Sequence, residues 1–505
     1  MRFRILILCA AAGALQAAPV TPGSCESLSG LSLKDGAITT AQAVAAGGFS
    51  LPAGRGRAAA PATDLPAFCR VEATLKPTGD SDIKIELWLP AASGWNGNFE
   101  ANGNGGWTGS IAPGTLAEGL KRGFAASMSD LGHEGGSASF AMGHPEKLVD
   151  FGYRAAHEMT VAAKAIAEAY YGRAPKYSYW NGCSAGGRSA LMEAQRYPAD
   201  FDGIVAGSPG LDWTGRSLLA VWIAQASHKD EASYIPPSKY PLIHKAALDA
   251  CDARDGVKDG IIEDPTRCHF DPKELECKNG DSDSCLTAAQ VETARAIYAG
   301  ASNPRTKQSV VPGFEPSSEL GWATMGGPQA FGLGTDLFKF VVYQNPNWDY
   351  KTFDFDTGVA QTAKAENGIL NAKDPNLNAF LSRGGKMIQY HGWSDPQIPP
   401  ESSVNYYKSV LEKIGGSSKV LSNYRLFMVP GMAHCGGGEG TSTFDMLSAL
   451  EQWVEKGKAP DQIAASRVRD GKVDRTRPLC PYPQVAQYKG SGSIDDAANF
   501  TCKMP

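Results

Sequence analysis

The fold is decided by the stretch Tyr177-Ser178-Tyr179-Trp180-Asn181-Gly182-Cys183-Ser184-Ala185-Gly186-Gly187. It begins as a short apolar strand, and the next residues, Arg188 to Arg196, have helical character. Between strand and helix, Gly182-x-Ser184-x-Gly186 matches the nucleophile elbow, in which small neighbours let a serine occupy a strained turn. An ordinary serine in a glycine-rich turn is the alternative, but the position between a strand and a helix favours the elbow.

The segments on either side of this turn alternate between strand and helix. Strands are predicted at 82–90, 177–180, 201–206, 386–390 and 424–429, and helices at 150–170, 188–196 and 444–456. This alternation predicts an α/β fold, with a mostly parallel sheet and helices on both faces. Residues 211–373 break the rhythm and contain four cysteines and many Asp, Gly and Pro residues. We therefore predict one α/β domain built from 19–210 and 374–505, with a large insertion at 211–373.

The N-terminus has the pattern of a signal peptide. Arg2 and Arg4 precede an apolar core, and small residues at Ala17 and Ala18 suit cleavage. A membrane anchor needs about 20 apolar residues, and this stretch is too short. We predict that residues 1–18 are a signal peptide and that the protein is secreted or periplasmic, with no membrane-spanning segment elsewhere.

Removal of the signal peptide, with Cys9, leaves ten of the eleven cysteines. An even number in an oxidising compartment predicts five disulfides. Local spacing favours Cys251–Cys268, Cys277–Cys285 and Cys480–Cys502, which leaves Cys25–Cys69 and Cys183–Cys435. Ten cysteines allow many other pairings, so this assignment is an inference from spacing.

Two of these cysteines adjoin candidate catalytic residues. Cys183 precedes Ser184, and Cys435 follows His434 in the loop Gly431-Met432-Ala433-His434-Cys435-Gly436. If the two cysteines are bonded, their Cα atoms lie about 5.5 Å apart. The serine and the histidine would then be close together, as a nucleophile and its general base must be.

Chain order supports a triad of Ser184, Asp395 and His434. His434 follows the strand at 424–429, and Asp395 follows the strand at 386–390. Serine, acid and histidine in that order are what this type of fold uses. A structural hydrogen bond is the usual role of a lone loop histidine or aspartate, but these positions at strand ends favour catalysis.

Asp130 and His133 precede the serine, which is the wrong order, and we interpret them as turn residues near the site.

Acyl transfer also needs hydrogen-bond donors for the developing oxyanion. The backbone amide of Ala185 is one candidate, because it follows the nucleophile. The second donor should come from an early strand-to-helix loop, and Gly105-Gly106 fits, with Gly106 favoured. A purely structural turn is the alternative for these glycines.

His391 is a candidate for the substrate pocket beside Asp395, with a structural role as an equal alternative.

An aspartate-rich loop lies in the insertion. The run from Cys251 to Ile261 contains Asp252, Asp255 and Asp259 within eight residues. Adjacent carboxylates repel unless a cation joins them, and hard oxygen ligands suit Ca²⁺. Backbone carbonyls of Val257 and Ile261 are candidates to complete the shell. The spacing is not that of an EF-hand, and a solvated acidic turn is the alternative.

Composition limits the class of partner. The formal net charge is −5, and no block rich in lysine or arginine stands out. Because nucleic-acid binding needs a concentrated basic surface, nucleic acid is not expected as a partner. A small-molecule substrate is expected instead, and the oligomeric state does not follow from the sequence.

Four motifs together resemble the tannase and feruloyl esterase family. They are Gly182-Cys183-Ser184-Ala185-Gly186-Gly187-Arg188, Phe201-Asp202-Gly203-Ile204-Val205-Ala206-Gly207, His391-Gly392-Trp393-Ser394-Asp395 and Pro430-Gly431-Met432-Ala433-His434-Cys435. The resemblance runs from about Cys25 to Cys502. It implies an α/β-hydrolase fold with a lid at 211–373 and the triad named above. It also implies the five disulfides and a structural Ca²⁺ held by Asp252, Asp255, Val257, Asp259 and Ile261.

The resemblance further implies an esterase for aromatic acids. Family members cleave ferulates, gallates and chlorogenate, and one similar bacterial enzyme cleaves the mono(2-hydroxyethyl) ester of terephthalate. That enzyme uses a lid arginine and an aromatic stacking residue. Here the stretch Gly327–Phe340 contains no arginine, and Lys339 is its only basic residue. Ile398 stands where that enzyme has the aromatic residue that stacks on the substrate ring. These differences favour a neutral phenolic ester. A terephthalate monoester hydrolase, a serine peptidase and a non-catalytic calcium-binding module are the alternatives.

Overall fold

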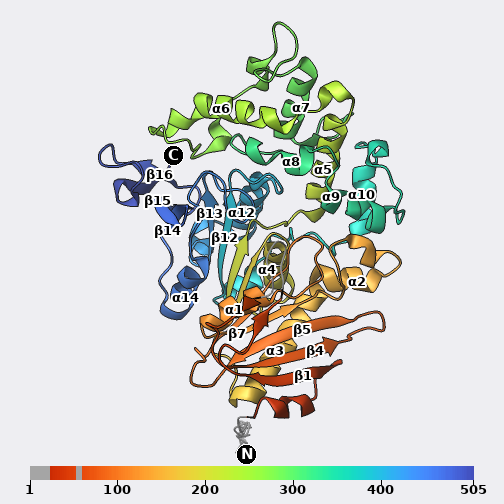
Figure 1. Cartoon of the computed structure of the whole chain (residues 1–505), viewed down its shortest axis with the longest axis vertical. Coiled ribbons are helices and arrows are strands. Elements are labelled where there is room, and N and C mark those ends of the chain that lie inside the picture. The colour runs from red at the N-terminus through yellow and green to blue at the C-terminus, as the bar shows by residue number, and fades with distance from the viewer. Residues whose placement is uncertain (1–22, 53–59) are drawn as a thin grey trace, which may run out of the picture.

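A nine-stranded sheet forms the centre of the molecule in this computed structural model, which describes residues 23–52 and 60–505 (Figure 1). The predicted signal peptide at 1–18 lies outside these residues. In sheet order the strands are β1 (Gly36–Val44), β4 (Phe68–Leu75), β5 (Ile83–Pro90), β7 (Ala125–Ser129), β6 (Phe99–Asn102), β8 (Ser178–Cys183), β9 (Gly203–Gly207), β12 (Lys386–Gly392) and β13 (Tyr424–Val429).

The sheet is parallel from β7 to β13 and antiparallel at its N-terminal edge. β7, β6, β8, β9, β12 and β13 all pair in parallel, whereas β1, β4, β5 and β7 pair antiparallel. The carboxyl ends of the parallel strands therefore meet at one edge of the sheet, where α/β folds place their sites. This arrangement confirms the predicted α/β-hydrolase fold.

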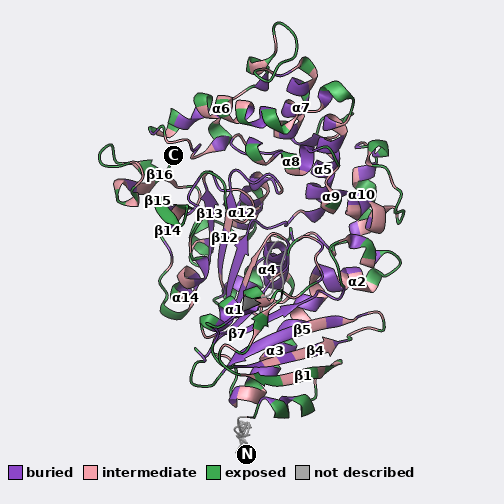
Figure 2. Cartoon of the chain, viewed as in Figure 1, coloured by how far each residue is buried: buried purple, intermediate pink, exposed green. Residues whose placement is uncertain are grey.

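Helices cover both faces of the sheet. α1 (Pro113–Lys121) and α14 (Met446–Lys456) pack on one face, and α3 (Ala155–Tyr171), α4 (Ala185–Arg196) and α12 (Pro400–Ile414) lie on the other. Side chains alternate along a strand, so Tyr179 of β8 joins the cluster around α14 while Trp180 joins the core on the opposite face. Buried residues accordingly predominate in the central strands and α4 (Figure 2), whereas the edge strand β1 has none, and both layers of the core are anchored by the strand that carries the elbow.

A mostly helical region connects β9 to β12 and lies beyond the carboxyl ends of the strands (Figure 1). Asp212 caps its first helix by accepting a hydrogen bond from the amide of Gly215. Its helices and strands are α5 (Trp213–Ser227), α6 (Tyr240–Cys251), α7 (Ala288–Ala299), β10 (Ala301–Ser302), β11 (Ser309–Val311), α8 (Ala323–Gly326), α9 (Gly332–Asp336) and α10 (Gly358–Glu366), and α11 (Asn378–Ser382) follows them, packed on α4 before β12. We call this region the lid.

The remaining elements are short. They are β2 (Ser50–Leu51), β3 (Ala60–Pro61), α2 (Pro145–Val149), α13 (Ser417–Val420), β14 (Ile463–Arg469), β15 (Lys472–Leu479), β16 (Val485–Tyr488) and β17 (Phe500–Lys503). β14 pairs with β15, and β16 pairs with β17, as two C-terminal hairpins. In the described ranges, no helix combines the length and the apolar character that crossing a bilayer requires.

Five disulfides connect the ten cysteines of the described chain. The pairs are Cys25–Cys69, Cys183–Cys435, Cys251–Cys268, Cys277–Cys285 and Cys480–Cys502. The predicted pairing is therefore confirmed. Four of the bridges close short local loops, whereas Cys183–Cys435 spans 252 positions of the chain and ties the middle of the sheet to its far edge.

Candidate active site

Ser184 occupies the turn between β8 and α4. Its backbone has φ 63°, a left-handed conformation that side-chain-bearing residues rarely adopt, and its amide donates to the carbonyl of Gly207 at 3.0 Å. A Cβ on Gly182 would lie 2.7 Å from the carbonyl group of Gly186. The two glycines of the motif are thus required by the close approach of strand and helix, as in a nucleophile elbow.

His434 connects Ser184 to Asp395. Its Nε2 lies 2.9 Å from the Ser184 Oγ, and its Nδ1 lies 2.7 Å from Oδ2 of Asp395. Asp395 follows β12 and His434 follows β13, so the parallel strands deliver both residues to the edge of the sheet at which Ser184 lies. The structure therefore brings together the three side chains that the sequence analysis predicted as a triad.

Asp395 is fully buried and has four hydrogen-bond partners. Its Oδ1 accepts from the amides of Gln397 at 2.8 Å and Ile398 at 3.0 Å, while Oδ2 faces both His434 and His391. Burial alone would raise the pKa of Asp395, but the charges of the two histidines and their hydrogen bonds outweigh burial and hold that pKa well below its ordinary value. Asp395 is consequently ionised and able to orient His434 through the Nδ1 hydrogen.

The disulfide between Cys183 and Cys435 lies directly beside this pair. The Cα atoms of the two cysteines are 6.0 Å apart. Cys435 has φ 62°, so the chain turns sharply immediately after His434. The bridge therefore fixes the loop that carries His434 to the end of the strand that carries Ser184.

The loop with the two oxyanion candidates packs against the elbow. A Cβ on Gly186 would lie 3.0 Å from the Cα of Gly103, so the Gly103–Gly106 loop touches the first turn of α4. Ala185 is the first residue of that helix, where backbone amides have no intrahelical acceptor and the helix dipole is positive. Gly106 has φ 53° and faces Leu333 of the lid, whose methyl groups would lie 3.2 Å from a Cβ there.

His391 and Ile398, the predicted pocket residues, are both buried beside Asp395. His391 is fully buried: its Nδ1 faces the Ser403 hydroxyl at 2.7 Å, and its Nε2 faces Asp395 at 3.1 Å and the Ile398 carbonyl at 3.2 Å. Ile398 is also buried and donates its amide to Asp395. His391 therefore has the structural role that the sequence left open as the alternative to the pocket, because its ring is buried at the end of β12 and both of its nitrogens have hydrogen-bond partners.

Asp130 and His133 do not pair with each other. Asp130 accepts from the amides of Lys84 and Gly132, and His133 contacts the Trp107 carbonyl at 2.8 Å. Both residues stabilise turns, as the sequence analysis interpreted them.

Arg216 of α5 is a buried residue near the site that sequence reasoning missed. It donates to the Leu333 carbonyl at 3.2 Å, and its guanidinium lies 4.8 Å from the Trp213 ring. Burial lowers the pKa of Arg216 to about 10, and the negative charge of Asp395 acts in the opposite direction. No motif marked this arginine, because only the folded lid brings α5 to Asp395.

The aspartate-rich loop of the lid brings together one buried and two partly buried aspartates, Asp252, Asp255 and Asp259. Asp252 accepts from the amides of Asp259 and Gly260, and Asp255 accepts from Val257. Burial, together with the neighbouring charges of Asp259 and Asp252, raises the pKa of Asp255 to about 6. Carboxylate oxygens and the backbone carbonyls of Val257 and Ile261 are the kind of ligand that Ca²⁺ takes.

Two arginines already approach one member of this loop. Arg477 forms an ion pair with Asp259, and Arg475 lies 3.3 Å from the same oxygen. These contacts join the loop to β15 in the C-terminal part of the chain. Ile261 of the loop also packs on Gly431, three residues before His434, so the loop touches the segment that carries the histidine.

The chain has close relatives among known proteins. Residues 69–503 match the family profile described as "Tannase and feruloyl esterase". An uncharacterized esterase from Xanthomonas campestris is 40% identical, with 98% of this chain and 93% of that protein covered. A probable feruloyl esterase B-2 from Aspergillus terreus is 35% identical over 86% of each chain.

Solved structures agree with these sequence matches. Feruloyl esterase B from Aspergillus oryzae superposes with a TM-score of 0.88 at 30% identity, covering 95% of this chain and 99% of that one. A tannin acyl hydrolase from Aspergillus niger has the same fold, with a TM-score of 0.78 at 22% identity and coverage of 96% and 94%. The chain therefore belongs to the tannase and feruloyl esterase family of carboxylic ester hydrolases.

Proposed function

We propose that this esterase cleaves esters of aromatic acids through a covalent acyl-enzyme formed on Ser184. The observation that carries the proposal is the continuous hydrogen-bonded chain from Asp395 through His434 to Ser184, with 2.7 and 2.9 Å contacts. Such a chain activates a hydroxyl that is otherwise a weak nucleophile. The strained turn at Ser184 holds that hydroxyl in place before the substrate arrives.

The reaction follows from this geometry. Ser184 Oγ attacks the ester carbonyl carbon while His434 Nε2 accepts its proton, and Asp395 stabilises the resulting imidazolium. The amides of Ala185 and Gly106 are the proposed donors to the oxyanion. The C–O bond of the tetrahedral intermediate then breaks, and His434 returns the proton to the leaving alcohol. Water, deprotonated by His434, attacks the acyl group and releases the acid and free Ser184.

The proposed acyl group is a neutral phenolic acid of the hydroxycinnamic or gallic type. The names of the relatives point to feruloyl esters. The lid supports this choice, since the stretch Gly327–Phe340 meets the oxyanion loop through Leu333 and carries no arginine for a free carboxylate. Arg216 comes from another helix, and one of its hydrogen bonds is already made to the protein backbone.

Replacement of the nucleophile tests the proposal. We expect Ser184→Ala to abolish hydrolysis of methyl ferulate and p-nitrophenyl esters with unchanged circular dichroism, while Ser110→Ala, an exposed serine in the adjacent loop, retains activity. A fluorophosphonate should label Ser184 and no other serine. Turnover of peptides instead of aryl esters would point to a peptidase. A Ser184 that resists labelling would point to a non-catalytic binding protein.

A structural Ca²⁺ in the lid is a second part of the proposal. Asp252, Asp255 and Asp259 would supply carboxylate oxygens, and Val257 and Ile261 would supply backbone carbonyls. The buried, mutually repelling carboxylates of this loop support the assignment. The ion would stabilise the lid rather than take part in the chemistry.

We also propose that the protein acts outside the cytoplasm, in the periplasm or beyond the cell. Five disulfides support an oxidising compartment, and the N-terminal pattern supports export. N-terminal sequencing of the protein recovered from a bacterial host should give a mature chain that begins after Ala17 or Ala18. A chain that retains residues 1–18 and stays in the cytoplasm would contradict this part.

A further inference from the structure

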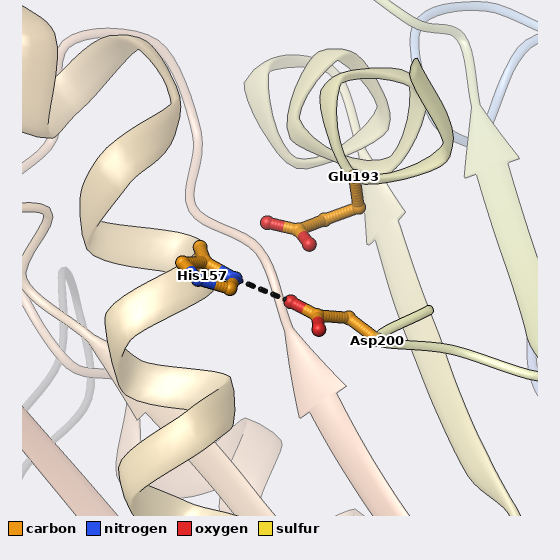
Figure 3. A group of neighbouring side chains, drawn as sticks. All are labelled: His157, Glu193 and Asp200. Atoms are coloured by element: carbon orange, nitrogen blue, oxygen red, sulfur yellow. Dashed lines mark hydrogen bonds and ion pairs between the residues drawn. The ribbon is translucent and has the colours of Figure 1, made fainter. Parts of the chain in front are cut away.

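A second group of chemically competent side chains lies at the opposite end of the sheet from Ser184. Figure 3 shows its members: His157 of α3, Glu193 near the end of α4, and Asp200 in the loop that leads to β9. Ser184 follows the carboxyl end of β8, whereas Asp200 precedes the amino end of the parallel strand β9. The group is therefore separate from the triad and plays no part in the esterase mechanism.

The three side chains converge on one point. One ligand atom from each, the His157 nitrogen and a carboxylate oxygen from Glu193 and Asp200, lies within 4.8 Å of the other two. His157 Nδ1 and Asp200 Oδ2 are 2.6 Å apart. Elsewhere in the described ranges, 23–52 and 60–505, no other three His, Cys, Asp or Glu residues are gathered this closely.

Glu193 is the member that demands an explanation. It is 1% exposed, and neither of its carboxylate oxygens has a hydrogen-bond partner. Its carboxylate points toward His157 and Asp200 (Figure 3). Because buried polar groups are nearly always satisfied, a buried carboxylate with two free oxygens indicates a missing partner.

The surroundings do not supply that partner. Within the described residues, no lysine or arginine forms an ion pair with Glu193 or Asp200. The Lys164 ammonium lies nearby but donates to the backbone carbonyl of Asp200. Tyr197 stacks on the His157 ring at 3.8 Å, which holds the imidazole in one orientation. The charge of Lys164 acts on both carboxylates, but neither Glu193 nor Asp200 forms a direct ion pair with it. The group thus combines a fixed imidazole with two carboxylates that have no lysine or arginine of the described residues bound to them.

We propose that His157, Glu193 and Asp200 bind one divalent transition-metal ion, with Zn²⁺ as the best match. Imidazole and carboxylate are ligands that zinc accepts at about 2.0–2.2 Å, and three protein ligands leave a fourth position for water. The side chains of His157 and Asp200 are 27% and 14% exposed, so water has access from that side. Calcium is a poor match, because it takes six to eight oxygen ligands and no nitrogen.

Metal binding needs only small side-chain movements. Ligand atoms of a tetrahedral zinc site lie about 3.3 Å apart, given zinc–ligand distances near 2.0 Å. His157 and Asp200, now 2.6 Å apart, must therefore separate slightly. The ion would tie α3 to α4 and to the loop entering β9, so its role is to stabilise the layer that supports the elbow. This inference does not rest on the proposed function.

A shared proton is the rival arrangement. Burial, reinforced by the charge of Asp200 and by the hydrogen bond that a shared proton forms between the two carboxyl groups, raises the pKa of Glu193 well above its ordinary value, so a protonated Glu193 would donate to Asp200. The two arrangements differ in a measurable way: a metal site needs an ionised Glu193, whereas a proton-sharing pair works equally well with a glutamine.

Zinc binding by the full mature chain distinguishes them. The protein is stripped with a chelator and kept in saturating Ca²⁺ so that the lid loop is occupied. Zn²⁺ binding is then measured by competition with a chromophoric chelator, and Co²⁺ binding by its visible d–d absorption. We expect one tight site per chain and a melting temperature raised by about 3 °C at a 100-fold excess over Kd.

Variants locate the site. Glu193→Gln and His157→Ala should each weaken Zn²⁺ binding by more than about 100-fold. His144→Ala is the matched control: it removes another histidine that contacts a single aspartate, at 2.9 Å from Asp80, and should leave binding unchanged. His157 is partly exposed, so its variant remains informative if Glu193→Gln fails to fold.

Three results would overturn the inference. The first is no stoichiometric Zn²⁺ binding by the wild-type chain. The second is tight binding that survives both substitutions, which would place the ion elsewhere, for example at His434. The third is a Glu193→Gln variant that melts at a higher temperature than wild type with or without Zn²⁺, which would establish the proton-sharing pair.

Discussion

Cys183 and Cys435 are bonded to each other with their Cα atoms 6.0 Å apart, although 252 positions separate them in the chain. One cysteine precedes Ser184 and the other follows His434. The bond therefore helps to hold the 2.9 Å contact between the nucleophile and the general base, a distance that proton transfer requires to stay short. The other four bridges close loops of at most 44 positions and do not join catalytic elements.

We predict that Cys183→Ser combined with Cys435→Ser lowers activity more than it lowers stability. Loss of the bridge should reduce the free energy of unfolding by about 2–4 kcal/mol, since the unfolded chain gains freedom. The His434 loop should also drift, and a displacement of about 1 Å can cost about 100-fold in rate. The measurement is kcat/KM on methyl ferulate beside urea unfolding of the same samples.

The pair Cys480 and Cys502 provides the control, because its bridge lies in the C-terminal hairpins. Replacing both with serine should destabilise the protein without reducing kcat at temperatures where it stays folded. If the two double variants lose activity only as they unfold, the central bridge is a general stabiliser and does not position His434.

His391 should act as a positioning residue for Asp395. Its Nε2 shares Oδ2 of Asp395 with His434, and Ser403 holds its other nitrogen. We expect His391→Ala to lower kcat by about 10-fold to 100-fold with little change in KM, because the acid loses its alignment. Ser403→Ala should give a smaller effect in the same direction. An unchanged kcat with a raised KM would instead indicate that His391 contacts the substrate.

Glu100 of β6 should make stability depend on pH. It is 3% exposed, and burial raises its pKa to about 7 against about 4.3 in an unfolded chain. Between these values the folded state binds more protons than the unfolded state, so stability falls as the pH rises through this window. Glu100→Gln removes this loss.

We therefore expect the stability of Glu100→Gln relative to wild type to increase by about 3 kcal/mol from pH 4 to pH 8. Urea unfolding at several pH values measures it. Glu118→Gln, an exposed glutamate on α1, is the control and should follow the wild-type curve. A difference between Glu100→Gln and wild type that is constant over this range would contradict the assignment.

Removal of Ca²⁺ should destabilise the lid. Adding EGTA should lower the melting temperature by several degrees, and Ca²⁺ but not Mg²⁺ should restore it. Asp255→Asn should melt at the lower temperature without responding to EGTA. Asp264→Asn, which removes an aspartate that caps a neighbouring turn, should respond as wild type does. An EGTA response that persists in Asp255→Asn would place the ion at another site.

The sequence predicted residues whose position depends on local pattern and chain order. Ser184, Asp395 and His434 each follow a strand of the parallel sheet, so finding the strands was enough to place them together. By contrast, β6 was not predicted, because Phe99–Asn102 is only four residues long, and its two polar residues, Glu100 and Asn102, are buried like the two apolar ones.

Side-chain direction and distant contacts could not be predicted. His391 lies close to Asp395 in sequence, but sequence does not say whether its ring faces the substrate or the interior. Arg216 reaches the site only because the lid folds over the sheet. His157, Glu193 and Asp200 likewise come from two helices and a loop, and each alone resembles an ordinary polar surface residue.

The most direct test of the account is the fate of the acyl group during one turnover. A p-nitrophenyl ester of ferulic acid is mixed with the enzyme in a rapid-quench instrument, and the quenched protein is digested and analysed by mass spectrometry. We predict a burst of one p-nitrophenol per chain and a feruloyl group on the peptide that contains Ser184. A steady release without a burst, together with no acylated Ser184 in wild-type enzyme quenched during turnover at saturating substrate, would contradict the proposed mechanism.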